Sequence, residues 1–106
     1  MVRVIGNYHW FDGAYFDHSK YRDSHMPLTA RLLQPHGLVK LESDQLILMQ
    51  EPKPGQIIAS SVAYFDNAQD AYAALKGAGK ALMADVANYS NISPELHIAV
   101  VTQHFG

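Results

Sequence analysis

The chain contains no cysteine, which excludes disulfides, thiolate catalysis and thiolate metal sites. No stretch approaches the roughly 18 consecutive apolar residues of a membrane-spanning helix, and the first ten residues hold no signal-type apolar run. Lysine and arginine number 8 against 10 acidic residues and are scattered, so there is no basic stripe of the kind that binds nucleic acid. We therefore expect a cytoplasmic protein that binds neither a membrane nor nucleic acid.

The composition that remains is that of one folded domain over residues 1–106. Of these residues, 48% are hydrophobic and 17% are charged, which is typical of a globular chain. A chain of this length buries about two-thirds of its extended surface when it folds. Self-association would bury more apolar surface and add stability.

Hydrophobic periodicity and turn signals predict the order strand, helix, strand, strand, helix, strand. The predicted strands are 2–10, 38–49, 57–65 and 96–102, with a bulge or turn at the polar residues 42–45 of the second. The predicted helices are 14–34 and 68–88. The turn residues 35–37 end the first helix, and Gly77 and Gly79 interrupt the second. This order is typical of the α+β ferredoxin-like βαββαβ fold, an antiparallel four-stranded sheet with helices on one face.

The pattern within the strands bears on what covers the other face of the sheet. Three of the four predicted strands carry apolar residues on both faces. A sheet with helices on one side only normally shows polar residues on its open side. We therefore expect a homodimer in which the open faces of two sheets pack together.

His25 is the first candidate for a catalytic residue. It follows Tyr21 by four residues, so both side chains share one face of the predicted helix, and Pro27 should kink or end that helix. Histidine is the side chain that most readily exchanges protons near neutral pH. Tyr21 could orient His25 or donate to a substrate oxygen. The alternative is a structural pair, with His25 bonded to the backbone at the bend and Tyr21 in the core.

Other polar and aromatic side chains are candidates for substrate binding. His9 and Trp10 end the first strand, where pockets form at the sheet rim, and Tyr64 ends the third strand. Asp85 stands among apolar residues, where its pKa would rise or where it would cap the segment before Asn88. Each also has a structural alternative. His9 would be a solvated histidine at the rim and Tyr64 would pack within the sheet. Asp85 would cap the segment that follows it, and Tyr89 would belong to a turn. The candidate binding residues are His9, Trp10, Tyr64, Asp85 and Tyr89.

The histidines do not have the spacing of a metal site. His18 and His25 are two helical turns apart, about 10 Å, so they cannot hold one ion together. No HExxH motif or close pair of histidines occurs. We expect no metal.

Two stretches resemble the EthD family of the dimeric α/β-barrel superfamily. In YFDHSKYRDSHMPL, the family pattern is an aromatic–aspartate pair and then a tyrosine four residues before a histidine that leads into x-Pro-Leu. In MADVANYSNISP, the pattern is Asp-x-x-Asn-aromatic-Ser/Thr. Lys20 departs from it, since the family often has a second aromatic residue there. The matching residues are Phe16, Asp17, Tyr21, His25, Pro27, Leu28, Asp85, Asn88, Tyr89 and Ser90.

The resemblance covers nearly the whole chain and implies the fold and the homodimer stated above, with two facing sheets. The family is named after a protein associated with ether degradation, which implies a role in ether or aromatic catabolism. Relatives in the superfamily isomerise lactones, cyclise or decarboxylate polyketides, or oxidise aromatics without a cofactor. The sequence has no Gly-rich phosphate loop for a nicotinamide or flavin. We expect no cofactor.

Two functions remain open from the sequence. The first is a cofactor-independent enzyme that acts on a small, largely apolar, oxygen-bearing molecule in a cavity between helices and sheet, with His25 transferring a proton. The second is a non-catalytic dimeric protein that binds such a molecule. A structural dimer without a pocket is a third interpretation, which solid packing around His25 would favour.

Overall fold

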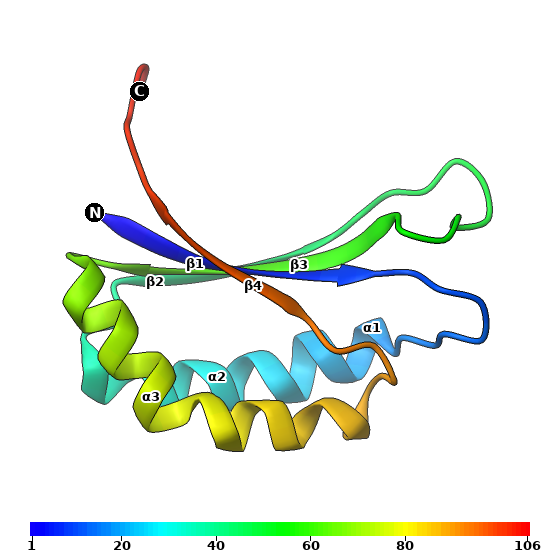
Figure 1. Cartoon of the computed structure of the whole chain (residues 1–106), viewed down its shortest axis with the longest axis horizontal. Coiled ribbons are helices and arrows are strands. Elements are labelled where there is room, and N and C mark those ends of the chain that lie inside the picture. The colour runs from blue at the N-terminus through cyan, green and yellow to red at the C-terminus, as the bar shows by residue number, and fades with distance from the viewer.

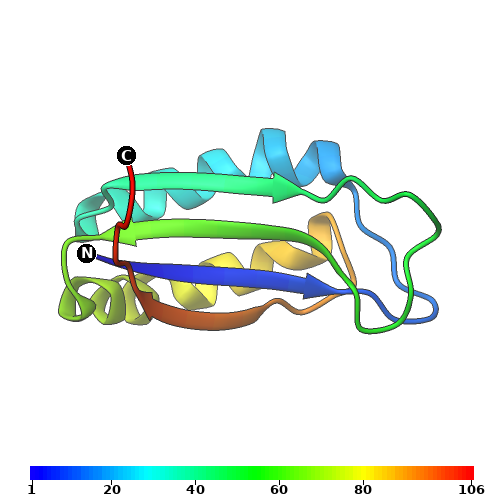
Figure 2. The ribbon, with the colours of Figure 1, turned by 90° about the horizontal axis from the view of Figure 1, so that it is seen from above.

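A computed structural model describes residues 1–106, which form an antiparallel sheet with helices packed on one face (Figure 1). The sheet has the order β2-β3-β1-β4, which is visible from above in Figure 2. This confirms the predicted α+β ferredoxin-like fold. The strands are β1 (Val2–His9), β2 (Lys40–Gln45), β3 (Ile57–Phe65) and β4 (Glu95–Val100).

One continuous helical segment follows β1. It consists of α1 (His18–Lys20), η1 (Tyr21–His25), α2 (Met26–Leu33) and η2 (Gln34–His36). The Asp17 carboxylate accepts a hydrogen bond from the Lys20 N–H at 3.1 Å and caps the start. The segment ends at Gly37, whose φ of 90° is readily adopted only by glycine, as the sequence predicted.

The helix does not end at Pro27, as one interpretation of the sequence allowed. Five residues before it, from Tyr21 to His25, adopt a π-helical turn, in which the Met26 N–H donates to the Tyr21 carbonyl five residues back. Pro27 then lies in the first turn of α2, where a missing N–H is tolerated. The irregularity predicted from the proline is therefore a widened turn that carries both Tyr21 and His25.

The second helix, α3 (Ala68–Asp85), is unbroken and leads into η3 (Val86–Asn88), so the predicted interruption at Gly77 and Gly79 was wrong. A glycine costs a helix only about 1 kcal/mol relative to alanine. The Asn67 side chain caps α3, and a stripe of buried alanines packs it on the sheet. None of the helices is both long and apolar enough to cross a membrane.

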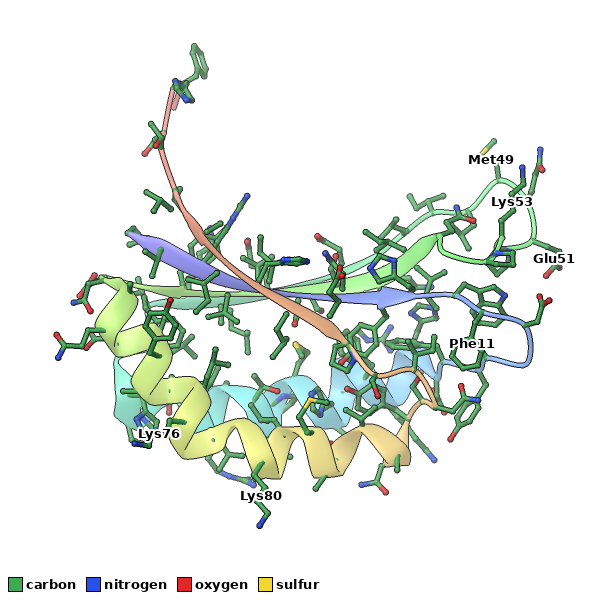
Figure 3. All side chains as sticks on the ribbon, in the orientation of Figure 1. Phe11, Met49, Glu51, Lys53, Lys76 and Lys80 are labelled. Carbon is green, nitrogen blue, oxygen red and sulfur yellow. The ribbon has the colours of Figure 1, made fainter.

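The strand β2 is shorter than predicted. Residues 42–45 belong to it without a bulge, and the chain leaves the sheet after Gln45. Because β2 lies at an edge, its polar side chains reach water, and charged residues suit an edge strand. Residues 46–56 form a loop beyond the end of the sheet, where Figure 3 shows Met49, Glu51 and Lys53 projecting away from the body.

The core between helices and sheet consists of two hydrophobic clusters. Alternate residues of β1 are buried toward the helices, as the sequence predicted. One cluster contains Val2, Val4, Leu33, Ala63, Phe65 and the alanines of α3. The other contains Tyr8, Tyr21, Ile58, Ala59, Val86, Tyr89 and Ile92.

The open face of the sheet is more polar than the sequence prediction held. The strand register places Arg3, Asn7, Lys40, Glu42, Asp44, Glu95 and His97 there, around a centre of Ile5, Val62, Tyr64 and Ala99. The prediction counted apolar residues strand by strand. In the register, the polar residues of β2 and β4 fall on this face and surround the apolar centre.

Candidate active site

A cavity of about 90 Å³ lies between the helices and the sheet, the place where the sequence led us to expect one. Both core clusters contribute to its wall, and small residues leave the space: Gly6 and Ser61 are register partners in β1 and β3, and Gly79 lies across from them on α3. Thirteen of the 19 lining residues are hydrophobic.

Few polar groups reach this cavity, and none of them is a lysine, arginine, aspartate or glutamate. They are His25, Thr29, Ser61 and Tyr8. The Thr29 hydroxyl donates to the His25 carbonyl at 2.7 Å, and the Tyr8 and Tyr89 hydroxyls bond to each other. His25 and Ser61 are therefore the polar side chains with most freedom to meet a ligand.

His25 is tied to Asp85, which stands at the end of α3. The imidazole Nδ1 lies 2.8 Å from carboxylate Oδ2, and the Asn88 amide donates to the other oxygen at 2.7 Å. The hydrogen bond from His25 holds the pKa of Asp85 below its ordinary value, against the effect of burial, and the bond from Asn88 adds to this.

This pairing fixes the tautomer of the neutral imidazole. A carboxylate only accepts hydrogen bonds, so the Nδ1 of His25 must carry the hydrogen. The lone pair then resides on Nε2, which forms no hydrogen bond within the protein. His25 is 6% exposed and lines the cavity, so a proton acceptor is available there.

Tyrosine rings enclose the imidazole. The Tyr21 ring stacks on it at 5.7 Å and 17°, and the Tyr89 ring lies 4.6 Å from it, centre to centre. Burial raises the pKa of both phenols, so each is a neutral hydroxyl over the physiological range. The Tyr21 hydroxyl is buried and has no hydrogen-bond partner.

The structure therefore brings four of the seven predicted site residues together: His25, Tyr21, Asp85 and Tyr89. Asp85 contacts His25 rather than a ligand site directly, and this pairing was not predicted. No local sequence signal could have revealed it, because the two residues are 60 positions apart.

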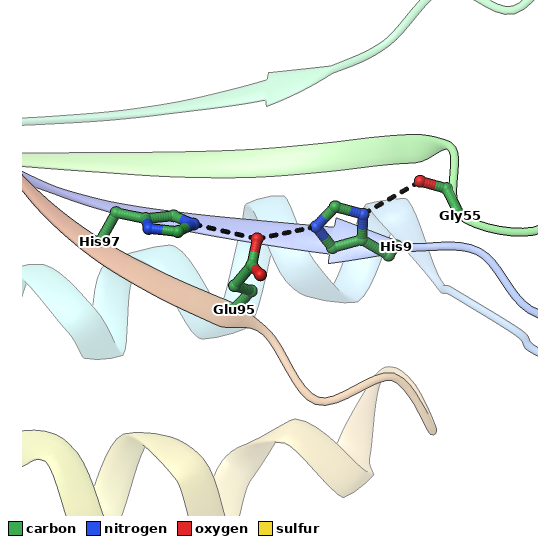
Figure 4. Close-up of polar contacts among 4 residues, drawn as sticks. All are labelled: His9, Gly55, Glu95 and His97. Atoms are coloured by element: carbon green, nitrogen blue, oxygen red, sulfur yellow. Dashed lines mark hydrogen bonds and ion pairs between the residues drawn. The ribbon is translucent and has the colours of Figure 1, made fainter.

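His9 lies on the open face of the sheet, away from the cavity. Its Nε2 is 3.0 Å from Glu95, which also binds His97 at 2.9 Å, and its Nδ1 is 3.0 Å from the Gly55 carbonyl (Figure 4). Both ring nitrogens thus face acceptors, which favours the imidazolium. The Gly55 carbonyl, followed by Glu95, raises the pKa of His9.

Two aromatic candidates also lie outside the cavity. Tyr64 lies on the open face with the Lys40 ammonium 5.2 Å from its ring centre, so its role there is a cation–π contact within the sheet. Trp10 packs against the cluster that contains Tyr8, and its backbone N–H donates to the Gln56 carbonyl at 2.8 Å. Contrary to the expectation from the sequence, neither residue lines the cavity between helices and sheet.

Sequence reasoning missed the residues that shape the cavity. Ser61 lies in the predicted strand 57–65 and Gly6 in the predicted strand 2–10, and neither was singled out. The signal was present in their pairing: two small residues at adjacent positions of neighbouring strands leave a hollow in a sheet. That pairing becomes visible only once the register is known.

No group of three or more histidine, aspartate and glutamate side chains gathers anywhere in the chain in a way that could hold a metal ion. The group His9, Glu95 and His97 is a pair of histidines on a single carboxylate oxygen.

No protein-family model and no curated protein sequence matches the chain. Solved structures do. An EthD-like protein from Ralstonia eutropha JMP134 is 29% identical, with 96% of this chain and 94% of that one covered and a TM-score of 0.77. An ethyl tert-butyl ether D (EthD) family protein from Bacillus halodurans C-125 is 20% identical over 96% and 99%, with a TM-score of 0.71.

A dimeric ferredoxin-like protein from an uncultured marine organism shares the fold at 13% identity, over 98% of this chain and 95% of that one, with a TM-score of 0.56. The two motifs around His25 and Asp85 now lie together in space, on a fold that matches the EthD proteins over nearly its whole length. The chain is therefore similar to the EthD-like proteins.

Proposed function

We propose that this protein is an enzyme that moves a proton within a small, largely apolar, oxygen-bearing molecule. The observation that carries the proposal is the environment of His25. Its Nδ1 is held by a half-buried carboxylate, and its Nε2 is free of protein partners at the wall of an apolar cavity. A histidine oriented by a carboxylate is the arrangement that general base catalysis uses.

The proposed step needs only side chains of this chain. Nε2 of His25 takes a proton from a carbon of the ligand, and the electron pair of the broken C–H bond remains with the ligand. The imidazolium that forms is stabilised by Asp85 at 2.8 Å. Return of the proton to a different atom completes an isomerisation, and the same first step begins a cyclisation. General base catalysis of this kind contributes about 10²- to 10⁴-fold in rate.

The lining of the cavity limits the substrate. No charged side chain other than a protonated His25 would face it, and most lining residues are hydrophobic. Such a site selects a small uncharged molecule. The family of the similar Bacillus halodurans protein is named after an ether, ethyl tert-butyl ether, which agrees with a role in the breakdown of ethers.

The protein works as a homodimer through the open face of its sheet. Val62 and Tyr64 lie at the centre of that face, and Nε of Arg3 is buried there without a hydrogen-bond partner. Glu42 and Asp44 on β2 offer carboxylates that a second copy could place on Arg3. The similar marine protein is described as dimeric.

Sedimentation equilibrium tests the dimer. Val62→Asp places a charge at the centre of the open face and should yield monomers, whereas Lys80→Asp should not. Figure 3 shows Lys80 on the side of α3 that faces away from the sheet. A monomeric wild type, or a Val62→Asp variant that remains dimeric, contradicts this assignment.

Hydrogen exchange tests the proton transfer with simple carbonyl compounds in place of the natural substrate. Small ketones and lactones are incubated with the protein in D₂O, and the loss of the hydrogen signals next to the carbonyl is followed by NMR. The wild type should accelerate this exchange, His25→Ala should abolish the acceleration, and Asp85→Asn should reduce it. His104→Ala, in the exposed C-terminal tail, is the matched control.

The alternative is a dimeric protein that binds such a molecule without changing it, and the largely apolar cavity favours it equally well. The same experiment separates the two. If the wild type binds a compound but leaves its exchange rate unchanged, or if His25→Ala exchanges as fast as the wild type, the catalytic proposal fails and the binding function stands.

A further inference from the structure

The wall of the cavity beside His25 reaches the surface of the protein at one place. Of the 19 residues that line it, only Met83 and Leu96 are largely exposed, at 42% and 48%, and all the others are buried or half-buried. A side chain that both lines a cavity and is open to solvent lies where the cavity meets the outside. Met83 belongs to the last turn of α3, and Leu96 belongs to the start of β4.

The course of α3 explains why the wall is open at this place. The strand β4 forms an edge of the sheet, so no further strand lies beyond it. Figure 2 shows α3 running obliquely beneath the sheet, from the side of β4 at its start toward the middle of the sheet at its end. The helix and the edge strand therefore diverge toward the end at which Met83 and Leu96 lie.

Two glycines keep space free beside these side chains. Gly79 precedes Met83 by four residues, so both lie on one face of α3, and both line the cavity. A Cβ at Gly79 would meet no atom within 4 Å, so the space beside it is empty. Across from it, Leu96 is the register partner of Gly6, and its side chain would lie 3.4 Å from a Cβ at that position.

We propose that ligands reach His25 through a mouth between α3 and β4, bounded by Gly79, Met83 and Leu96, and that Met83 and Leu96 set the width of the molecules that enter. The side chains with which α3 and β4 line the cavity are all uncharged. An ion would lose its hydration at such an entrance, whereas an apolar molecule gains from contact with it. The mouth admits narrow uncharged molecules, and its role as the way to a catalytic histidine rests on the proposed function.

A single cysteine in the cavity measures access through the mouth, because the chain has no cysteine of its own. Ser61→Cys places a thiol at the cavity wall. Methyl methanethiosulfonate, a narrow reagent, forms a mixed disulfide with this thiol and releases methanesulfinate, and mass spectrometry follows the rate. Adding Met83→Trp or Leu96→Trp should lower the rate by about tenfold or more, since each indole fills part of the mouth. Adding Met83→Ala should speed the reaction of the wider benzyl methanethiosulfonate.

Two further variants in the Ser61→Cys background are the matched controls. Ala84→Trp adds the same indole one residue after Met83, but Ala84 is exposed and does not line the cavity, so the rate should not change. Leu41→Ala shortens a lining side chain on β2, at the opposite edge of the sheet, and should not speed the wide reagent. Because all variants carry the same cysteine, its own reactivity cancels when their rates are compared.

The proposal is overturned if Met83→Trp and Leu96→Trp react as fast as Ser61→Cys alone, or if Leu41→Ala speeds the wide reagent as much as Met83→Ala does. It is also overturned if the folded Ser61→Cys protein reacts no faster than it unfolds, which urea unfolding kinetics measure. Labelling requires no proton transfer. A mouth that controls labelling in a protein that does not exchange hydrogens refutes the proposed catalysis and leaves the mouth standing.

Discussion

The imidazole of His25 and the carboxylate of Asp85 are 2.8 Å apart, although 60 residues separate them in the chain. The bond ties the π-helical turn η1 to the end of α3, the two places where the family motifs occur. It therefore has a structural effect as well as a chemical one, because it joins the two helical segments at one end of the cavity.

The bond should make stability depend on pH on the acid side. The pKa of Asp85 is lowered in the folded state by the hydrogen bond from His25, so its contribution is present above the ordinary value of 3.8 and is lost as pH falls through the folded value. Urea unfolding is measured from pH 6 down to pH 2 for the wild type and Asp85→Asn. The wild type should have the larger free energy of unfolding at pH 6, and this difference should shrink as pH falls. A constant difference between the two proteins would contradict the assignment.

The two glycines of α3 should respond differently to alanine. A Cβ at Gly79 meets nothing within 4 Å, so Gly79→Ala should raise the free energy of unfolding by about 1 kcal/mol through helix propensity. A Cβ at Gly77 would lie 2.6 Å from the His36 ring. Gly77→Ala should therefore raise the free energy of unfolding less than Gly79→Ala does, or lower it. In a His36→Ala background, Gly77→Ala should become stabilising by about the same 1 kcal/mol. Urea titrations of the four variants measure this, and equal effects of Gly77→Ala in both backgrounds would sink the explanation.

The bond between the Tyr8 and Tyr89 hydroxyls should show coupling in a double-mutant cycle. Each single change to phenylalanine leaves the other buried hydroxyl unpartnered, at a cost of about 1–3 kcal/mol. The double change removes both groups and should cost less than the sum of the singles. Additive losses in chemical unfolding would mean that water or another group already satisfies these hydroxyls.

The pKa of His9 should lie above that of an ordinary histidine. The Gly55 carbonyl and Glu95 raise its pKa, so its contribution to stability is present below the ordinary value of 6.5 and is lost as pH rises through the folded value. NMR titration should place the pKa of His9 above the ordinary value of 6.5. Glu95→Gln should lower the pKa of His9 only in part, because the Gly55 bond remains. A full return of the His9 pKa to the ordinary value would show that Glu95 alone causes the shift.

Much of the fold follows from local pattern. Alternation in β1 and β3 and the turn at Gly37 are properties of a few neighbouring residues, and each was predicted from them. The interruption of α3 was predicted wrongly, because helix propensity is weak against packing. The reason for Gly77 is a ring from another helix, which no local window contains.

The site was predictable to the extent that it is local. Tyr21 and His25 share one turn, so their spacing was enough to place them together. Tyr64 and His9 lie on the open face of the sheet instead of at the cavity. Alternation divides the residues of a strand between two faces, but it does not say which face the helices cover. Ser61 and Gly6 acquire meaning only through the register of two strands, which depends on the whole sheet.

The π-helical turn also constrains how the gene can change. The turn holds one residue more than a regular helix would, so a deletion between Tyr21 and His25 would tighten it into an α-helix. Because the tightened turn would hold one residue less, the residues after it would keep their orientation, and Thr29 and Leu33 would stay buried. A deletion in the regular turns of α2 has no extra residue to absorb it and would rotate every later residue by about 100° about the helix axis. The widened turn is therefore where this helix can lose a residue without turning its buried side outward, at the cost of the stacking between Tyr21 and His25.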